Sequence, residues 1–149
     1  MADFSARLLL VRAADLLAAI DAASVREILS TPAATRIPGA PAAVLGLINV
    51  RGELVTLIHG RRLLGRDVGG EAEDAAVEGS LVLLSWGGVG VGLVVDEVVD
   101  LVPAGEVDMT PREELPGIDP RMVRAVGLHG GRSFLVLDLD ALFRPLLAA

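Results

Sequence analysis

Side chains able to support catalysis or bind a metal are sparse in this sequence of 149 residues. It contains no cysteine and only two histidines, His59 and His129, which excludes disulfides, thiolate chemistry and cysteine-ligated zinc. No Gly-x-Ser-x-Gly sequence is present, and a Walker phosphate-binding loop is impossible without lysine. A nucleophile and its base would have to come from unrelated loops. We therefore expect no catalytic residues, no metal site and no cofactor.

Carboxylates near the expected strand ends are the remaining candidates for binding a hard cation: Asp96, Glu97, Asp100, Asp138 and Asp140. Their spacing does not match a calcium-binding loop, so we interpret them as solvated strand ends. The glycine-rich stretch 87–92 has some similarity to a dinucleotide-binding loop. It lies inside an expected hairpin with no helix after it, so tight turns are the better interpretation.

The stretch from Gly46 to Ile58 has the sharpest signature in the chain. Two apolar runs flank Arg51-Gly52, which predicts a β-hairpin with its turn at these two residues. Gly52 can adopt a positive φ without a Cβ clash, and the Asn49 amide can bond nearby backbone. The turn would present Arg51 to solvent. For an isolated Arg-Gly pair, an ordinary solvated turn is the usual outcome.

Composition narrows the class of partner. All 13 cations are arginine and the net charge is −7, so the chain has no basic stripe for a nucleic-acid backbone. Apolar residues make up 52% of the chain, but the uncharged run from Leu81 to Val95 spans only about 15 residues and contains several glycines. It is too short for a membrane-spanning helix. The first residues do not resemble a signal peptide, so we expect a cytoplasmic protein without direct membrane insertion.

The order of expected elements repeats. Residues 8–29 align with residues 81–102 at an offset of 73, and residues 52–64 align with residues 131–143 at an offset of 79. Short strands joined by glycine or proline turns recur in both halves. The sequence therefore predicts an all-β, mainly antiparallel fold with short helices, in which two small duplicated barrels pack over an aliphatic seam.

Local patterns in the first half predict the elements around the hairpin. Ala22 to Ser24 can form one helical turn, and a strand over 25–29 would place Val25, Glu27 and Leu29 on one face. The proline-rich stretch 31–41 is expected to be a surface crossover.

Further patterns concern the helices and linkers. A short helix is expected at 61–64, ended by Gly65, and an acidic linker or loop near 66–79. Residues 103–122 are expected to form an extended crossover. A last helix is predicted to begin at Ala141, with Asp140 as its cap and a kink at Pro145.

Together, Val25-Arg26-Glu27-Ile28-Leu29, the crossover 36–41 and Gly46-Leu47-Ile48-Asn49-Val50-Arg51-Gly52 resemble the CheW family of chemotaxis coupling proteins. The likeness extends through residues 92–98, 127–128 and 137–139 and covers most of the chain from about Arg7 to Leu147. The Asn-x-Arg-Gly element is specific, whereas the other pieces are individually weak. One departure is His59-Gly60, where the family commonly has Asp-Leu; the second half keeps that pair as Asp138-Leu139.

The resemblance implies one domain over residues 1–149, made of two five-stranded, SH3-like β-barrel subdomains. The chain has no room for a receiver domain or a kinase core, so the solitary coupling type is implied. Family members are adaptors without catalysis of their own. Their partners are the cytoplasmic tip of methyl-accepting chemotaxis receptors and the regulatory domain of the CheA histidine kinase.

By position, six residues match the region that faces the receptor tip or supports that surface: Val25, Glu27, Ile28, Asn49, Arg51 and Gly52. The guanidinium of Arg51 could hold a receptor carboxylate or a helix carbonyl through its forked donors. The kinase contact is expected at apolar ends of the lobes, without assignment to residues.

Two alternatives remain open at this stage. The chain could serve a non-flagellar chemosensory pathway, such as surface motility or second-messenger control. Less favoured is a small β-barrel enzyme or ligand-binding protein that uses the groove between the lobes, with His59 and nearby carboxylates.

Overall fold

The computed structural model describes residues 6–31, 34–66, 79–111 and 118–147, which are mostly β-structure. The strands are β1 (Arg7–Ala13), β2 (Leu16–Asp21), β3 (Val25–Ser30), β4 (Val44–Val50), β5 (Glu53–His59), β6 (Ser80–Trp86), β7 (Val89–Val95), β8 (Glu97–Pro103), β9 (Asp108–Pro111), β10 (Val123–His129) and β11 (Arg132–Leu137). The helices are η1 (Ala22–Ser24), α1 (Gly60–Leu63), η3 (Ala104–Glu106), η4 (Pro120–Met122) and α2 (Leu139–Leu147). The helical turn expected at 22–24 is confirmed.

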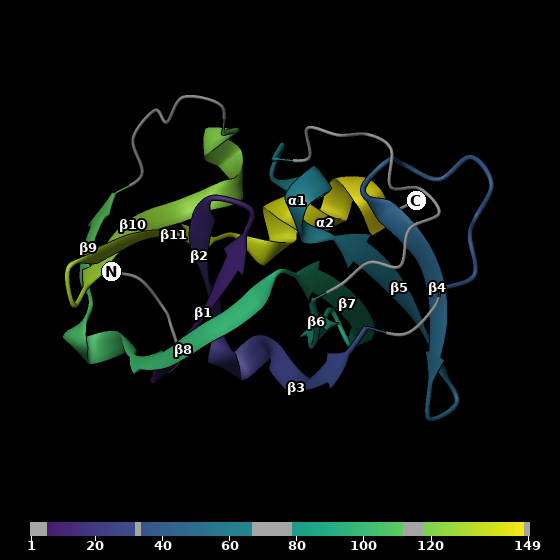
Figure 1. Ribbon diagram of the computed structural model, residues 1–149, viewed down its shortest axis with the longest axis horizontal. Coiled ribbons are helices and arrows are strands. Elements are labelled where there is room, and N and C mark those ends of the chain that lie inside the picture. Colours follow the sequence, from purple (N-terminus) through teal and green to yellow (C-terminus); the bar gives the residue numbers. More distant parts are fainter. Residues whose placement is uncertain (1–5, 32–33, 67–78, 112–117, 148–149) are drawn as a thin grey trace.

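The strands form two sheets that lie side by side (Figure 1). One has six strands in the order β8-β1-β2-β11-β10-β9, and the other has five in the order β3-β6-β7-β5-β4. The predicted two-lobed, mainly antiparallel fold is confirmed. The sixth strand, β9, lies within the stretch 103–122 that was expected to be an extended crossover. It pairs with β10 because Val107 and Met109 pack against the apolar cluster inside this sheet.

Each sheet combines strands from both halves of the duplicated chain. The hairpin β1–β2 pairs with β8 and, in parallel, with β11. The corresponding hairpin β6–β7 pairs with β3 and, again in parallel, with β5. The two halves therefore exchange their first hairpins, and neither sheet is built from one half alone.

The predicted hairpin turns have the backbone that a two-residue loop needs. Three of them have two consecutive residues with positive φ: Arg51 (50°) and Gly52 (89°), Gly87 (58°) and Gly88 (81°), and Gly130 (60°) and Gly131 (80°). Such turns match the right-handed twist of the strands they join. The expectation that Gly52 has a positive φ is confirmed, and Arg51 shares that conformation although it carries a side chain.

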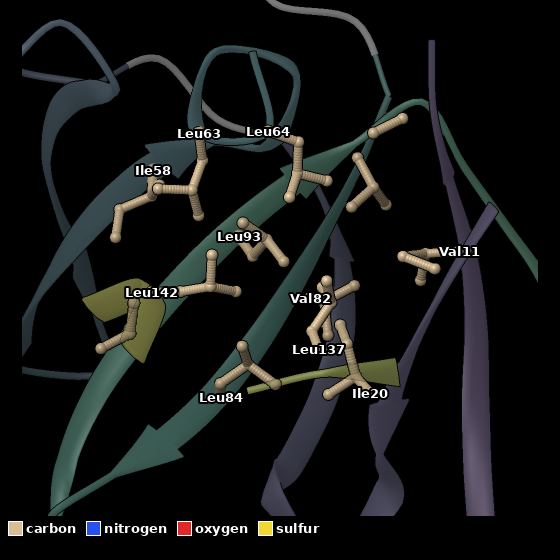
Figure 2. Close-up of a cluster of buried hydrophobic side chains, with 14 of the residues drawn as sticks. Val11, Ile20, Ile58, Leu63, Leu64, Val82, Leu84, Leu93, Leu137 and Leu142 are labelled. Atoms are coloured by element: carbon tan, nitrogen blue, oxygen red, sulfur yellow. The ribbon is translucent and has the colours of Figure 1, made fainter. Parts of the chain in front are cut away.

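Three apolar clusters hold the sheets together. Each sheet curls around a cluster of its own, and the third, here called the central cluster, lies between the sheets (Figure 2). The central cluster draws on both sheets and both α-helices through side chains such as Val11, Ile20, Ile58, Leu63, Val82, Leu93, Leu137, Leu142 and Phe143. Among its fully buried members only Phe143 is aromatic, in agreement with the predicted aliphatic seam.

The two α-helices differ in detail from the expectation. The first spans Gly60–Leu63, one residue earlier than expected, and ends before Gly65 as predicted; Gly65 has a φ of 71°. The last begins at Leu139, because the Asp138 carboxylate accepts a hydrogen bond from the Ala141 N–H at 3.1 Å. Asp140 is therefore inside the helix and is not its cap. The helix continues past Pro145 to Leu147, and Leu146 and Leu147 pack against the central cluster.

The sequence predicted no membrane-spanning helix and an acidic linker near residues 66–79. In the part of the chain that the structure describes, no helix has the length and apolar character needed to cross a membrane. The acidic linker expected near 66–79 falls largely on residues 67–78, which lie outside the described residues.

Gly46 gives a test of how closely the crossover packs on β4. A Cβ at Gly46 would lie 2.2 Å from the carbonyl oxygen of Thr35, and its φ is 149°. We predict that Gly46→Ala lowers the free energy of unfolding by about 2 kcal/mol or more, because β4 and the crossover must separate. Gly105→Ala is the control, since a Cβ added there would meet no atom within 4 Å. Equal stability of the two variants in urea denaturation would contradict this packing.

Candidate functional site

The turn between β4 and β5 presents the residues of the Asn-x-Arg-Gly element. Asn49 accepts a hydrogen bond from the Gly52 N–H through Oδ1 at 2.8 Å, as its sequence position suggested. A Cβ at Gly52 would meet no atom within 4 Å, so glycine is required here by its φ and not by crowding. The Asn49 side chain thus stabilises the turn, and Arg51 projects from it.

The Arg51 guanidinium is paired within the chain. Nη1 donates to Glu27 Oε2 at 2.5 Å and Nη2 donates to Glu27 Oε1 at 2.8 Å, a forked arrangement that joins the hairpin to β3. These hydrogen bonds lower the pKa of the Glu27 carboxyl from its ordinary value. The side chain of Arg51 is 69% exposed and that of Glu27 is 30% exposed. The structure therefore brings two of the predicted residues into one exposed, oriented pair.

A second ion pair lies beside the first, and sequence reasoning missed it. Arg26 Nη1 donates to Glu53 Oε1 at 2.9 Å, and Glu53 Oε2 accepts the Gly90 N–H at 3.0 Å. The pattern that could have revealed it is the charge order, because Arg26-Glu27 on the strand is complementary to Arg51 and Glu53 on the hairpin.

The remaining predicted residues lie apart from this pair. Val25 is half-buried against the central cluster, so its role is packing. Ile28 is 45% exposed and points to the face of β3 opposite Glu27, since side chains alternate along a strand. The six predicted residues thus divide into a charged tip of Glu27, Asn49, Arg51 and Gly52, and two flanking apolar side chains.

The six-stranded sheet has a related ion pair at the equivalent place. Asp100 lies 73 residues after Glu27, Arg132 lies 79 residues after Glu53, and they form an ion pair at 3.0 Å. The pKa of Asp100 is lowered first by the hydrogen bond from the Leu101 N–H and then by Arg132. Both sheets therefore join an edge strand to the last hairpin through charge, although the hairpin position that holds a glutamate in one sheet holds an arginine in the other.

An exposed apolar row runs across β5, β7 and β6 of the five-stranded sheet. Leu54 is 63% exposed and Val89 is 52% exposed. Leu54 lies opposite Asn49, and Val89 lies opposite Trp86. The parallel ladder of β5 and β7 begins at Thr56 and Val91, two residues along each strand from Leu54 and Val89. We call Leu54, Val89 and Trp86 the apolar row; it shares no residue with the ion pair of the charged tip.

Trp86 connects this row to the last helix. Its ring packs edge-on against Phe143 with centroids 6.2 Å apart, and its Nε1 donates to Asp140 at 3.3 Å. Arg144 lies over the ring at 5.9 Å and is paired with Asp140. One end of the apolar row is therefore held rigidly by α2.

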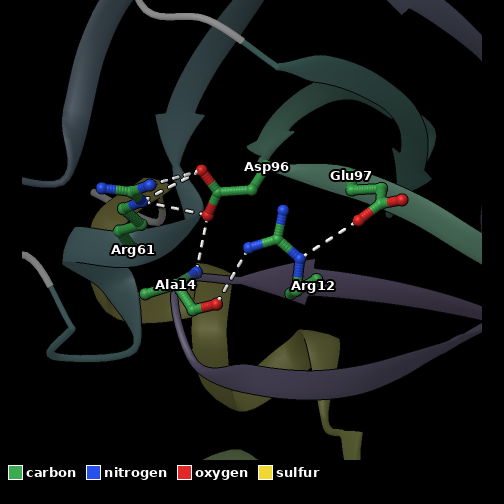
Figure 3. Close-up of polar contacts among 5 residues, drawn as sticks. All are labelled: Arg12, Ala14, Arg61, Asp96 and Glu97. Carbon is green, nitrogen blue, oxygen red and sulfur yellow. Dashed lines mark hydrogen bonds and ion pairs between the residues drawn. The ribbon is translucent and has the colours of Figure 1, made fainter.

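Asp96 ties the two sheets together and is not the solvated strand end that the sequence suggested (Figure 3). Arg61 on α1 donates to both carboxylate oxygens at 2.6 to 3.1 Å, and the Ala14 N–H in the β1–β2 turn donates at 2.6 Å. The Asp96 side chain is only 15% exposed. Hydrogen bonding from Arg61 is the main cause of its lowered pKa. Nearby, Arg12 pairs with Glu97 at 3.1 Å.

The described residues contain no group of three or more histidine, cysteine or acidic side chains arranged to hold a metal ion. His59 ends β5 in the five-stranded sheet. His129 ends β10 in the six-stranded sheet, where its Nε2 lies 3.5 Å from Glu106. The two histidines therefore belong to different sheets.

The alternative hypothesis invoked a groove between the lobes, with His59 and nearby carboxylates. The space between the sheets is filled by the central cluster. A surface groove of about 780 Å³ lies instead between the crossover at 36–42, the start of β4 and α1, with Arg36 and Arg62 among its lining residues. His59 does not line it.

Comparison with known proteins connects this geometry to a family. The CheW-like domain family matches residues 7–146. The chain is 31% identical over 121 residues to a "Chemotaxis protein CheW" of Rhizobium meliloti (strain 1021), covering 80% of this chain and 76% of that protein. It is 29% identical over 126 residues to a "Chemotaxis protein CheW" of Treponema pallidum (strain Nichols), covering 83% and 74%.

The fold also has a counterpart among solved structures. The crystal structure of the scaffolding protein TtCheW from Thermoanaerobacter tengcongensis superposes with a TM-score of 0.78 at 23% identity, over 93% of this chain and 92% of that one. At this level of identity the match concerns the fold.

The Asp96 junction predicts a specific pH dependence. Because folding lowers the Asp96 pKa from 3.8, its stabilisation is complete above that value and is lost as the pH falls through the lowered pKa. Asp96→Asn should cost about 2 kcal/mol at pH 7 and progressively less at acidic pH.

Urea denaturation followed by the fluorescence of the single tryptophan, Trp86, measures this difference at each pH. Glu97→Gln is the control, since the exposed Arg12–Glu97 pair should contribute less than about 1 kcal/mol. A cost of Asp96→Asn that did not change between pH 7 and pH 3 would contradict the assignment.

Proposed function

This chain belongs to the CheW-like domain family, whose members are chemotaxis scaffold proteins and not enzymes, and on that premise we propose that it couples methyl-accepting chemotaxis receptors to a CheA-type histidine kinase. It would act in the cytoplasm, recruited to receptor arrays at the inner face of the membrane. In this role it sets kinase output by holding two partners in a fixed geometry. Two separate contact surfaces on one rigid body are therefore needed.

The observation that carries the receptor contact is the forked pair of Arg51 with Glu27. An arginine in a turn normally loses side-chain freedom when it binds, and here the fork with Glu27 already restricts it. Two N–H groups serve Glu27, and a guanidinium has five, so donors can also reach a receptor carboxylate or a helix C-terminus. The charged tip thus offers directional hydrogen bonds without an unpaired charge.

The kinase contact is proposed for the apolar row across β5, β7 and β6. Leu54 and Val89 are among the most exposed large apolar side chains in the described residues, and Trp86 is held by Phe143 and Arg144. Apolar anchors on a rigid support are typical of binding hot spots. Because this row and the ion pair of the charged tip share no residue, we expect that both partners can be bound together.

Charge reversal tests the receptor contact. We expect Arg51→Glu to bind a receptor-tip fragment about tenfold or more weakly, because it removes the donors and places two carboxylates together. The double variant Glu27→Arg with Arg51→Glu restores the internal pair but presents the opposite charge order. Fluorescence anisotropy with a labelled receptor-tip fragment measures both.

The matched control is Arg121→Ala, an exposed arginine paired with Asp119 in the six-stranded lobe. It should bind the receptor fragment like the parent chain. Full receptor affinity in the charge-swapped double variant would mean that the pair serves only the fold, and the proposed role of Arg51 would be wrong.

Substitution in the apolar row tests the kinase contact separately. Leu54→Asp should reduce affinity for the kinase regulatory domain by about tenfold, with stability changed by about 0.5 kcal/mol because the side chain is 63% exposed. Leu128→Asp is the control, an exposed leucine on the other sheet. Isothermal titration calorimetry measures the affinities. An equal loss in both variants would count against a kinase surface centred on Leu54.

A further inference from the structure

The tip of the β4–β5 hairpin extends beyond the backbone support of its sheet. Strand β5 begins at Glu53, but its ladder with β7 starts only at Thr56, which pairs with Val91. The turn with Arg51 therefore lies several residues past the last backbone pairing with β7, and in Figure 1 it projects from the body of the molecule. A two-stranded hairpin on its own is only marginally ordered in water.

Glu53 supplies a link at the point where the ladder stops. One carboxylate oxygen accepts the Gly90 N–H of β7 at 3.0 Å, and the other accepts from Arg26 of β3 at 2.9 Å. This one side chain therefore joins the projecting tip to two other strands of the sheet. It lies two residues from Arg51 but does not contact it in the described hydrogen bonds and ion pairs.

An irregularity in β3 makes this arrangement possible. The register of β3 against β6 shifts between Val25 and Glu27, which leaves Arg26 at a bulge. A bulge redirects a side chain that would otherwise point to the other face of the strand. Consecutive residues Arg26 and Glu27 can therefore both reach the hairpin, one to Glu53 and the other to Arg51.

The residue at position 90 must be small for the same reason. A Cβ on Gly90 would lie 2.8 Å from Glu53 Oε2 and 3.1 Å from Arg26 Nη1. Any larger side chain would push the carboxylate away from the Gly90 N–H. The Glu53 link therefore depends on Gly90 as well as on Arg26.

We propose that Glu53 is the positioning residue of the receptor contact: by fastening the hairpin tip to Gly90 and Arg26, it sets the position from which Arg51 meets the partner. This inference rests on the proposed function and adds to it a residue outside the Asn-x-Arg-Gly element. Glu53 acts through Arg51 and not by touching the receptor. Its effect on binding should therefore disappear when Arg51 is absent.

A double-mutant cycle tests this dependence. Glu53→Ala should weaken binding of a labelled receptor-tip fragment by about fivefold to tenfold in the parent chain, and should cause no further loss in the Arg51→Ala background. Glu53→Gln should bind with intermediate affinity, because its amide oxygen can still accept the Gly90 N–H. Gly90→Ala should reproduce the loss although residue 53 is still glutamate, because the added Cβ displaces its carboxylate.

The matched control is Arg132→Ala, since Arg132 occupies the equivalent position in the duplicated half and pairs with Asp100. It should leave receptor binding unchanged. The inference is overturned if Glu53→Ala binds like the parent chain. It is equally overturned if Glu53→Ala weakens binding by the same factor with and without Arg51, because Glu53 would then act independently.

Amide hydrogen exchange in the free protein separates this inference from the proposed function. Glu53→Ala should speed exchange at Gly52 and Gly90 by about fivefold or more, with little change at Val136 in the core of the other sheet. Unchanged exchange at Gly52 would overturn the positioning role of Glu53, whatever the result of the receptor-binding experiments. Failure of the parent chain to bind any receptor fragment, with exchange altered as expected, would refute the receptor contact but leave the mechanical role of Glu53 intact.

Discussion

The exchange of hairpins between the two halves of the chain is the constraint on which the rest of the structure depends. Each sheet needs strands from both halves, with β2 beside β11 and β5 beside β7 in parallel. Neither sheet can form completely from one half, so the sheets are bound to each other by covalent connections as well as by the central cluster. The proposed adaptor role requires such rigidity, because two partners held on a flexible body would not be held in a fixed geometry.

Ion pairs and charged hydrogen bonds add further links between elements at the edges of the two sheets. The Asp96 carboxylate links α1 to the β1–β2 turn, and so joins elements that pack on different sheets. The pairs Glu27–Arg51 and Asp100–Arg132 join an edge strand to the last hairpin of each sheet. Exposed pairs of this kind contribute little to stability. Their effect is better understood as orientation, and at the hairpin tip orientation is what a forked contact needs.

Much of the fold could be predicted from sequence because the duplication is visible in the strand and turn pattern. The offsets of 73 and 79 residues relate equivalent elements correctly, and the turn at Arg51-Gly52 follows from glycine's tolerance of positive φ. The equivalence of two elements does not reveal which strands each of them pairs with, however. Nothing in the periodicity says that a hairpin from one half inserts beside strands of the other, since both arrangements bury the same residues.

The candidate site was predicted less completely for a related reason. Its residues were found by their place in a motif, which says nothing of contacts between positions far apart in the chain. The pairing of Glu27 with Arg51 spans 24 residues and requires the two edges of the sheet to approach. Arg26 and Glu53 were missed because their role depends on a bulge and on the end of a ladder, and neither has a sequence period. Asp96 was misjudged since burial by Arg61 is a tertiary effect.

The most direct test of the adaptor proposal is whether one molecule binds both partners at once. Analytical ultracentrifugation of the purified chain with a receptor-tip fragment and a CheA-type regulatory domain from the same organism measures this. The account predicts a ternary complex that contains all three components, since the ion pair of the charged tip and the apolar row share no residue. Mutually exclusive binding of the two partners, or no binding of either by the folded chain, would contradict it.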